Sequence, residues 1–336
     1  MTDLPEPSSS ESKPASQLRS ILENPLPPTD TNVLQRDLLQ EDISPRTILE
    51  NHESYCHSCA DIRQFSNPTL IYITPWNNHG YDLVKIFTQK FDYISPVWFR
   101  IKRKGFQNYL IEGLHDIDVS WIEALKTKRS DVRIVPRVSF ERWSADDLHA
   151  LFQSEDEKQE VSLTLKNLLT EYTHLFDGFV LEILSQFHEP GPVSPIEWIK
   201  EVMRKFPISK RDASVKLFLG INFYGYRYDH IMPPPPKDKS QYHMQHIVGR
   251  SYLDFLKQYY PTAKIHFDTR AHEHVTVVYT RSEANVNRQA HYMPQIIIFY
   301  PSLKSIYDRL QLAMKFNVGV AIWDGGQGFD YFFDLF

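Results

Sequence analysis

The sequence predicts an α/β fold in which helices cover both faces of a parallel β-sheet. Short strands that are apolar throughout alternate with helical stretches from about residue 67 onward, as expected for strands buried on both sides. A (β/α) barrel and a doubly wound sheet both fit this order. No G-x-G-x-x-G motif follows the first strand, which disfavours a dinucleotide-binding sheet. The side chains at the C-terminal strand ends, where a barrel carries its active site, favour the barrel: Trp76, Trp98, Glu182 and Trp323.

The expected elements follow one another in a regular order. Apolar runs predict strands, and amphipathic stretches of helical period predict the helices between them. The first half is expected to contain strands at residues 70–73, 93–99, 133–138 and 178–184, and helices at 81–90, 121–127, after 144, and 161–172. The second half is expected to contain helices at residues 196–205 and 303–316, and strands at 216–223 and 318–323. A long excursion begins at the proline run 233–236 and is expected to hold a helix at 252–259 and short strands near 265, 275–279 and 296–299.

The change in composition along the sequence suggests one folded domain after an N-terminal extension. Residues 1–66 are rich in serine, proline and acids without a sustained apolar period, so we expect them to be mostly disordered. Residues 67–336 are expected to form the barrel domain, with a small α+β insertion at about 230–300.

Composition excludes several classes of function. The net charge is −5 and no long basic run occurs, so nucleic acid is not an expected partner. No apolar run has the roughly 18 residues of a membrane span. The first residues lack the features of a secretory signal, so the chain as written would remain in the cytosol.

The candidate metal and redox motifs are weak. Cys56 and Cys59 are the only cysteines, which excludes a disulfide framework and leaves only half of a zinc site. His272-Glu273-His274 lacks the helical H-E-x-x-H spacing and favours a solvated hairpin. We therefore expect no metal and no cofactor.

Four segments carry a resemblance to a known family. Residues 176–184, Phe-Asp-Gly-Phe-Val-Leu-Glu-Ile-Leu, are similar to the strand-four signature D-G-x-D-x-D-x-E of glycoside hydrolase family 18, the chitinase-like (β/α)8 TIM barrels. Residues 219–225, 300–305 and 319–324 are similar to its strand seven, the helix entry before strand eight, and strand eight with its floor tryptophan. The phrases TPWNNHGYD, FDYISPVWF, GLHDIDVSW and GQGFDYFFDL resemble the chitinase-domain-containing branch. The resemblance covers about residues 50–336 and implies a secreted or lysosomal protein.

The signature is degenerate where the family carries its chemistry. Asp177 and Gly178 match it, and strand alternation places Val180, Glu182 and Leu184 on the inward face. The resemblance implies that Leu184 occupies the position of the general acid, and leucine cannot donate a proton. Glu182 stands where the family has an aspartate that positions the substrate acetamide. This position is displaced by about 6.6 Å along the strand from that of the general acid. Proton transfer needs a distance of roughly 3 Å, so we expect no hydrolysis.

The family's fifth and sixth strand-helix units have no counterpart here. After residues 185–187 the sequence passes through His-Glu-Pro-Gly-Pro directly to the helix before strand seven. The barrel is thus expected to lack about 60 residues and to remain open between strands four and seven. Exposed strand edges would favour self-association.

We interpret the chain as a non-hydrolytic, lectin-like protein that binds chitin-type or other amino-sugar oligosaccharides. The candidate carbohydrate-binding residues are those near the strand ends: Trp76, Trp98, Arg137, Glu182, Asn222, Tyr224, Trp323 and Asp324. The tryptophans could equally be core residues, and Glu182 could form a structural ion pair with Arg137. Two alternative functions are an active glycosidase that uses Glu182 or Glu189 as its acid, and a truncated isoform or interaction scaffold without a ligand.

Overall fold

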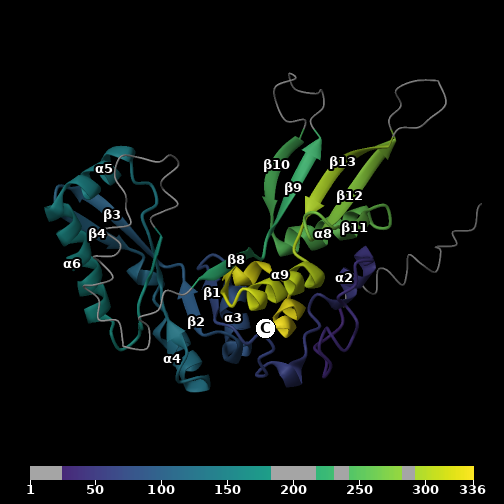
Figure 1. Ribbon diagram of the computed structural model, residues 1–336, viewed down its shortest axis with the longest axis horizontal. Coiled ribbons are helices and arrows are strands. Elements are labelled where there is room, and N and C mark those ends of the chain that lie inside the picture. Colours follow the sequence, from purple (N-terminus) through teal and green to yellow (C-terminus); the bar gives the residue numbers. More distant parts are fainter. Residues whose placement is uncertain (1–24, 183–216, 231–241, 282–291) are drawn as a thin grey trace, which may run out of the picture. The chain divides into compact units, whose positions relative to one another are not determined.

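The computed structural model describes residues 25–182, 217–230, 242–281 and 292–336. The chain divides into two compact units (Figure 1). The parallel-sheet unit comprises residues 61–223 and 309–327, and the antiparallel-sheet unit comprises residues 1–60, 224–308 and 328–336. Leu184, Glu189, the helix expected at 196–205 and the segment expected to lack two strand-helix units lie outside the described residues.

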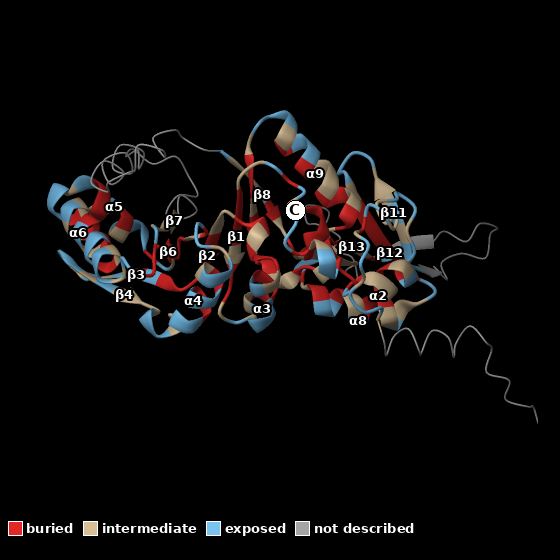
Figure 2. Ribbon diagram, turned by 90° about the horizontal axis from the view of Figure 1, so that it is seen from below, coloured by how far each residue is buried: buried red, intermediate tan, exposed pale blue. Residues whose placement is uncertain are grey.

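The core of the parallel-sheet unit is a five-stranded sheet in the order β5-β2-β1-β14-β8 with all pairs parallel. Its strands are β1 (Thr69–Ile73), β2 (Tyr93–Pro96), β5 (Arg133–Ile134), β8 (Phe218–Asn222) and β14 (Gly319–Trp323). The parallel pairing and the apolar strands agree with the α/β class expected from the sequence. In Figure 2 the ribbon of β1 and β2 is largely in the colour of buried residues.

A second sheet continues two of these strands, in the order β4-β3-β6-β7. Its strands are β3 (Phe99–Gly105), β4 (Asn108–Glu112), β6 (Arg137–Ser139) and β7 (Val180–Glu182). The single strands expected at 93–99 and 133–138 are each divided in two, with breaks at residues 97–98, directly after Pro96, and at residues 135–136. Pro136 has no N–H for a ladder hydrogen bond, which accounts for the second interruption.

The strands of the parallel-sheet unit therefore run in the order seven, eight, one, two, three, four of the expected barrel. The barrel is not closed among the described strands, where β8 and β7 stand at opposite ends of the row. The reason expected from the sequence, the loss of strands five and six, concerns residues 183–216 and stays a prediction.

Helices connect these strands in the alternation that the sequence predicts. They are α3 (Asn78–Ile86), α4 (Val119–Lys128), α5 (Ala145–Gln153) and α6 (Glu155–Glu171), with 3₁₀ turns at Thr88–Lys90, Leu114–Asp116 and Gly325–Gln327. Ser144 and Asp147 form a capping box that starts α5, and Ser154 caps α6. Amphipathic α9 (Leu303–Lys315) precedes β14. No helix in the described part of the chain combines the length and apolar character that a membrane crossing requires.

The basic stretch after Phe99 belongs to a β-hairpin. β3 and β4 pair antiparallel through a tight turn, in which Gly105 has φ 156° and Gln107 has φ 52°. Arg103 of β3 contacts Glu157 of α6 at 2.6 Å. Tyr109 of β4 also donates a hydrogen bond to Glu157, which is fully buried. The hairpin therefore brings this basic strand into contact with α6.

The antiparallel-sheet unit contains a five-stranded sheet in the order β10-β9-β13-β12-β11. Its strands are β9 (Gly225–His230), β10 (Tyr242–Ile247), β11 (Lys264–Asp268), β12 (Glu273–Arg281) and β13 (Tyr292–Phe299). Helix α8 (Gly249–Tyr259) packs on one face, where the hydroxyls of Tyr252 and Thr276 lie 2.6 Å apart. This sheet and its helix occupy the region expected as a small α+β insertion.

The N-terminal segment differs from the loose extension expected, over its described part from residue 25. Helix α2 (Pro45–Asn51) and a 3₁₀ turn (His57–Cys59) are present, and Val33, Leu49 and Cys56 are almost fully buried. A short-range disulfide joins Cys56 to Cys59. The buried apolar residues of this segment are spaced irregularly along the sequence, so they show neither a helical nor a strand period. Asp334, in the 3₁₀ helix Asp330–Leu335, accepts the backbone N–H groups of Val33 and Cys56 at 3.1 and 2.8 Å.

Candidate functional site

The C-terminal ends of β8, β14, β1 and β2 bring four predicted or newly found residues into one row. Strand register pairs Trp323 with Asn222 and Tyr72 with Ser95. The rings of Tyr72 and Trp323 lie 4.9 Å apart at 54°, so β1 and β14 present them on the same face. Paired residues in neighbouring strands share a face of the sheet. The row is therefore aromatic in its centre and polar at its ends.

Arg137 of β6 lies at the centre of the candidate site. Its Nε donates a hydrogen bond to Glu182 Oε2, and its Nη2 donates to Glu141 Oε1 at 2.9 Å. The guanidinium carbon lies 5.3 Å from the ring centroid of Trp323. The structure thus joins three residues that the sequence singled out, Arg137, Glu182 and Trp323, in one contiguous cluster. The ion pair between Arg137 and Glu182, which the sequence left open as a structural alternative, is present.

The cluster is largely buried. The side chain of Arg137 is 6% exposed, whereas those of Glu182 and Glu141 are 32% and 40% exposed. Burial by itself lowers the pKa of Arg137, but the hydrogen bonds and charges of Glu182 and Glu141 outweigh it and raise that pKa. The guanidinium therefore remains charged between two carboxylates.

Tyr72 and Glu141 belong to this cluster and were not predicted as site residues. The run Leu-Ile-Tyr-Ile at residues 70–73 indicated only a buried strand, although alternation with Leu70 would have assigned Tyr72 a face. Glu141 lies four positions after Arg137, beyond the end of β6, and no pattern marks it. Burial, and then the charge of Glu182, raises the pKa of Tyr72, so its hydroxyl stays protonated as a possible donor.

Three polar groups on this face have donors without a hydrogen-bond partner among the described residues. Ser95 and Ser139 are fully buried, and their hydroxyls make no hydrogen bond with that part of the chain. Ser139 shares its face with Arg137 by alternation and pairs in register with Glu182. The Nη1 group of Arg137 likewise has no partner there. Buried polar groups are nearly always hydrogen-bonded in native proteins, so such groups call for an explanation.

Trp98 and Trp76 lie in opposite environments. Trp98 is 4% exposed and donates its indole N–H to the Tyr81 hydroxyl at 2.7 Å. Its ring packs against Trp121 and Phe176 at about 6 Å, so it is a core residue in this structure. Trp76 follows β1 and is 69% exposed, which leaves its ring available at the surface.

The remaining predicted residues lie at three further positions. Asn222 ends β8 and is half-buried. Tyr224 belongs to the antiparallel-sheet unit, where its ring contacts Tyr226 and His246 edge to face. Asp324 follows β14 with φ 53°, is almost buried, and accepts the Thr74 hydroxyl at 3.1 Å. Burial raises the pKa of Asp324, although hydrogen bonds from Thr74 and its neighbours oppose this.

Asp177, the first residue of the degenerate signature, is structural. Its carboxylate accepts the Ile134 backbone N–H and pairs with Lys126, both at 2.8 Å. These contacts tie the loop before β7 to the end of β5 and to α4. A Cβ added at Gly178 would lie 3.7 Å from Val135 Cγ1, an ordinary van der Waals contact. Leu184, the residue on which the absence of hydrolysis depends, lies outside the described residues.

Two concavities lie elsewhere in the parallel-sheet unit. An open groove of ≈ 760 Å³ runs between α3 and α4 and is lined by residues that include Tyr81, Asp82, Asp118 and Trp121. The second, of ≈ 410 Å³, lies at the N-terminal ends of β1, β2 and β5. Within the described ranges no group of three or more His, Cys, Asp or Glu residues is arranged to hold a metal ion.

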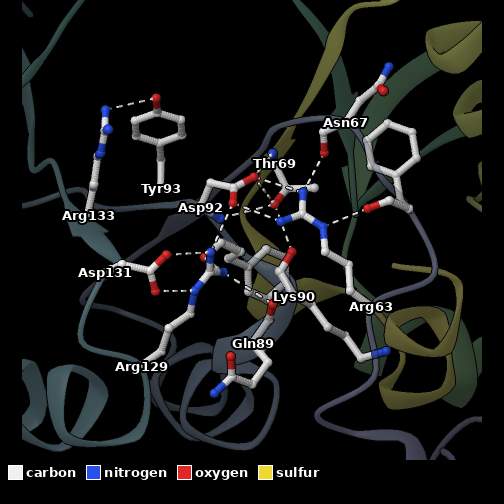
Figure 3. Close-up of polar contacts among 12 residues, drawn as sticks. Arg63, Asn67, Thr69, Gln89, Lys90, Asp92, Tyr93, Arg129, Asp131 and Arg133 are labelled. Carbon is white, nitrogen blue, oxygen red and sulfur yellow. Dashed lines mark hydrogen bonds and ion pairs between the residues drawn. The ribbon is translucent and has the colours of Figure 1, made fainter. Parts of the chain in front are cut away.

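The second concavity surrounds a structural ion-pair network. Figure 3 shows Arg63 and Arg129 converging on Asp92, which precedes β2. The Asp92 carboxylate also accepts the backbone N–H of Thr69, the first residue of β1, at 2.9 Å. Arg63 and Arg129 also donate hydrogen bonds to backbone carbonyls, and Arg129 donates a further one to Asp131. The network therefore joins the starts of two strands, as expected for the stability face of a barrel.

Comparison with solved structures places this geometry on a known fold, although no family model matches the sequence. The Group IV chitinase of Ostrinia furnacalis, solved in complex with allosamidin, is 11% identical over 80% of this chain and 98% of that chain, with a TM-score of 0.56. A chitinase from Chromobacterium violaceum is 13% identical over 80% and 98%, with a TM-score of 0.53. Human YKL-39, described as a pseudo-chitinase with retained chitooligosaccharide binding properties, is 12% identical over 80% and 98%, with a TM-score of 0.52. At these identities the likeness shows the fold, a mixed α/β fold of the kind found in family 18 chitinases and chitinase-like proteins.

Proposed function

We propose that this protein binds oligosaccharides of the chitin or amino-sugar type at the Arg137–Glu182–Trp323 cluster and does not hydrolyse them. The observation that carries the proposal is a pair of buried hydroxyls without hydrogen-bond partners among the described residues, those of Ser95 and Ser139, on the face that carries Trp323 and Tyr72. Sugars present many hydroxyl and carbonyl oxygens next to apolar ring faces. A face that combines unsatisfied donors with Trp323 and Tyr72 matches that chemistry.

Hydrolysis is the less favoured function because the cluster commits its carboxylate to an ion pair. Glu182 Oε2 accepts an N–H from Arg137, so this oxygen cannot at the same time donate a proton to a leaving group. The expected replacement of the general acid by Leu184 leads to the same conclusion. The neighbours include both kinds of protein, active chitinases and a pseudo-chitinase that keeps chitooligosaccharide binding.

Calorimetric titration with an N-acetylated chitotetraose tests the proposal. Trp323→Ala removes the aromatic platform and is expected to weaken binding by about 1–3 kcal/mol, the range measured for stacking surfaces. Phe106→Ala is the matched control, because Phe106 is an exposed aromatic residue at the β3–β4 turn. Circular dichroism checks that both variants fold. Equal affinities in wild type and folded Trp323→Ala would place the ligand elsewhere.

We also propose membership of the chitinase-domain-containing branch and, with it, a secreted or lysosomal setting. The support is the four sequence phrases between Thr74 and Leu335 quoted above. Fractionation of cells that express the full-length gene product, followed by detection in medium and lysosomes, tests the location. Recovery only from the cytosolic fraction would contradict it.

A further inference from the structure

The face of Trp323 is already occupied by the protein's own cation. The Arg137 guanidinium lies over the ring at 5.3 Å, and the Tyr72 ring leans against it at 4.9 Å. A pyranose that stacks on Trp323 must therefore take the place of the guanidinium. A cation–π contact contributes more to stability when it is desolvated, so replacing the guanidinium by a sugar ring costs free energy.

The exchange also has an electrostatic cost that depends on the ligand. Arg137 forms ion pairs with both Glu182 and Glu141, so one guanidinium is shared between two carboxylates. When Arg137 withdraws, Glu141, which is 40% exposed, can be solvated by water. Glu182 is the more enclosed carboxylate, and its charge helps to raise the pKa of half-buried Tyr72. A neutral sugar leaves Glu182 without its guanidinium, and an ammonium group on the sugar replaces that guanidinium.

We propose that the site selects amino-sugar oligosaccharides with free, protonated amines over fully N-acetylated ones, and that Glu182 is the residue that makes this selection. This inference rests on the proposed function and names its ligand class. Arg137 acts as an internal competitor in the same site. Its guanidinium marks the position and charge of the group that the ligand supplies. The hydroxyls of Ser95 and Ser139 donate hydrogen bonds to the neighbouring sugar oxygens.

Calorimetric titration with two oligomers of equal length, glucosamine tetramer and N-acetylglucosamine tetramer, tests the inference at a pH that keeps the amines protonated. The wild-type protein is expected to bind the amine form about tenfold more tightly, as one charge-assisted hydrogen bond to a half-buried carboxylate allows. Glu182→Gln keeps the shape of the side chain and is expected to abolish the preference, with the acetylated tetramer bound as well as before or better. Glu141→Gln is expected to reduce the preference only partly, because Glu141 is the more exposed partner.

Glu123→Gln is the matched control, since Glu123 is an exposed residue of α4 and its replacement changes the net charge by the same amount. A preference that persists in Glu182→Gln, or that falls equally in Glu123→Gln, would assign it to the overall charge and overturn the inference. Equal or tighter binding of the acetylated tetramer by wild type would also overturn it, while leaving oligosaccharide binding in place. Failure of both tetramers to bind would instead refute the proposed function.

Discussion

Replacing Asp92 by asparagine is expected to destabilise the parallel-sheet unit by about 3 kcal/mol. The Asp92 carboxylate accepts two N–H groups of Arg63 at 2.7 and 2.8 Å, one of Arg129 at 3.1 Å, and the Thr69 backbone N–H at 2.9 Å. Asparagine keeps one acceptor oxygen and turns a donor toward the partners of the other, so about two of these bonds are lost. The rest lose the charge that strengthens them, and each charged bond contributes roughly 1.5–3 kcal/mol.

The control is Asp131→Asn, which alters a second partner of the same Arg129 side chain. Asp131 is 77% exposed, so its pair with Arg129 is a surface salt bridge and its loss is expected to cost less than about 1 kcal/mol. Urea denaturation followed by near-ultraviolet circular dichroism measures both variants against wild type. Equal losses would mean that partial burial adds nothing to the Asp92 network, and the reasoning would fail.

The Asp92 contribution also has a defined pH dependence. Burial by itself raises the pKa of Asp92, but its hydrogen bonds from Arg63, Thr69 and Arg129 outweigh this and lower the pKa below 3.8. The stabilisation is therefore complete above the ordinary pKa and is lost as the pH falls through the lower folded value. The difference between wild type and Asp92→Asn is expected to narrow under strongly acidic conditions.

Three further predictions address other parts of the molecule. Product analysis with chitin oligomers is expected to show no turnover, and turnover that disappears in Glu182→Gln would identify Glu182 as an acid after all. Burial lowers the pKa of His274, which lies 2.7 Å from the Ser302 hydroxyl, so the antiparallel-sheet unit is expected to lose stability as the pH falls below about 6.5. Thermal melts between about pH 7 and pH 5 measure this loss, which a His274→Gln variant should show to a smaller degree. Glu157→Gln should cost about 3 kcal/mol, because it removes the buried charge that Arg103 and Tyr109 contact and turns an NH₂ donor toward one of these two donors. A loss below about 1 kcal/mol in urea denaturation would contradict that view.

The strands were predictable where one physical requirement dominates. The apolar runs at β1 and β14 have to be buried on both faces, and such runs read as strands in any context. The breaks after Pro96 and at Pro136 were not predicted, although proline provides the signal, because apolar residues continue on both sides. A change of register at such a break reverses which side chains point inward. Trp98 was expected to be a possible sugar platform, and in the break after Pro96 it packs into the core.

The candidate site was predictable in part for the same reason. Glu182 and Trp323 each end a strand, Arg137 lies in the last part of the strand expected at 133–138, and parallel strands bring their ends together. Sequence position cannot show that the Arg137 guanidinium covers the Trp323 ring, because that contact depends on side-chain rotamers. Ser95 and Ser139 look like ordinary small strand residues, and only the three-dimensional structure shows that their hydroxyls are buried without partners in the described part of the chain.

The hydrogen bonds of Asp334 have a consequence for how the protein is made. The backbone N–H groups of Val33 and Cys56 are bound by a carboxylate, that of Asp334, which is synthesised 301 and 278 positions later. While the ribosome is still translating, the segment around α2 has no carboxylate for these two N–H groups, and its apolar residues remain without their final packing. Long-range closures of this kind slow folding and prolong the exposure of apolar surface. The antiparallel-sheet unit is therefore completed only once Asp334 has emerged, even though Val33 and Cys56 are synthesised early.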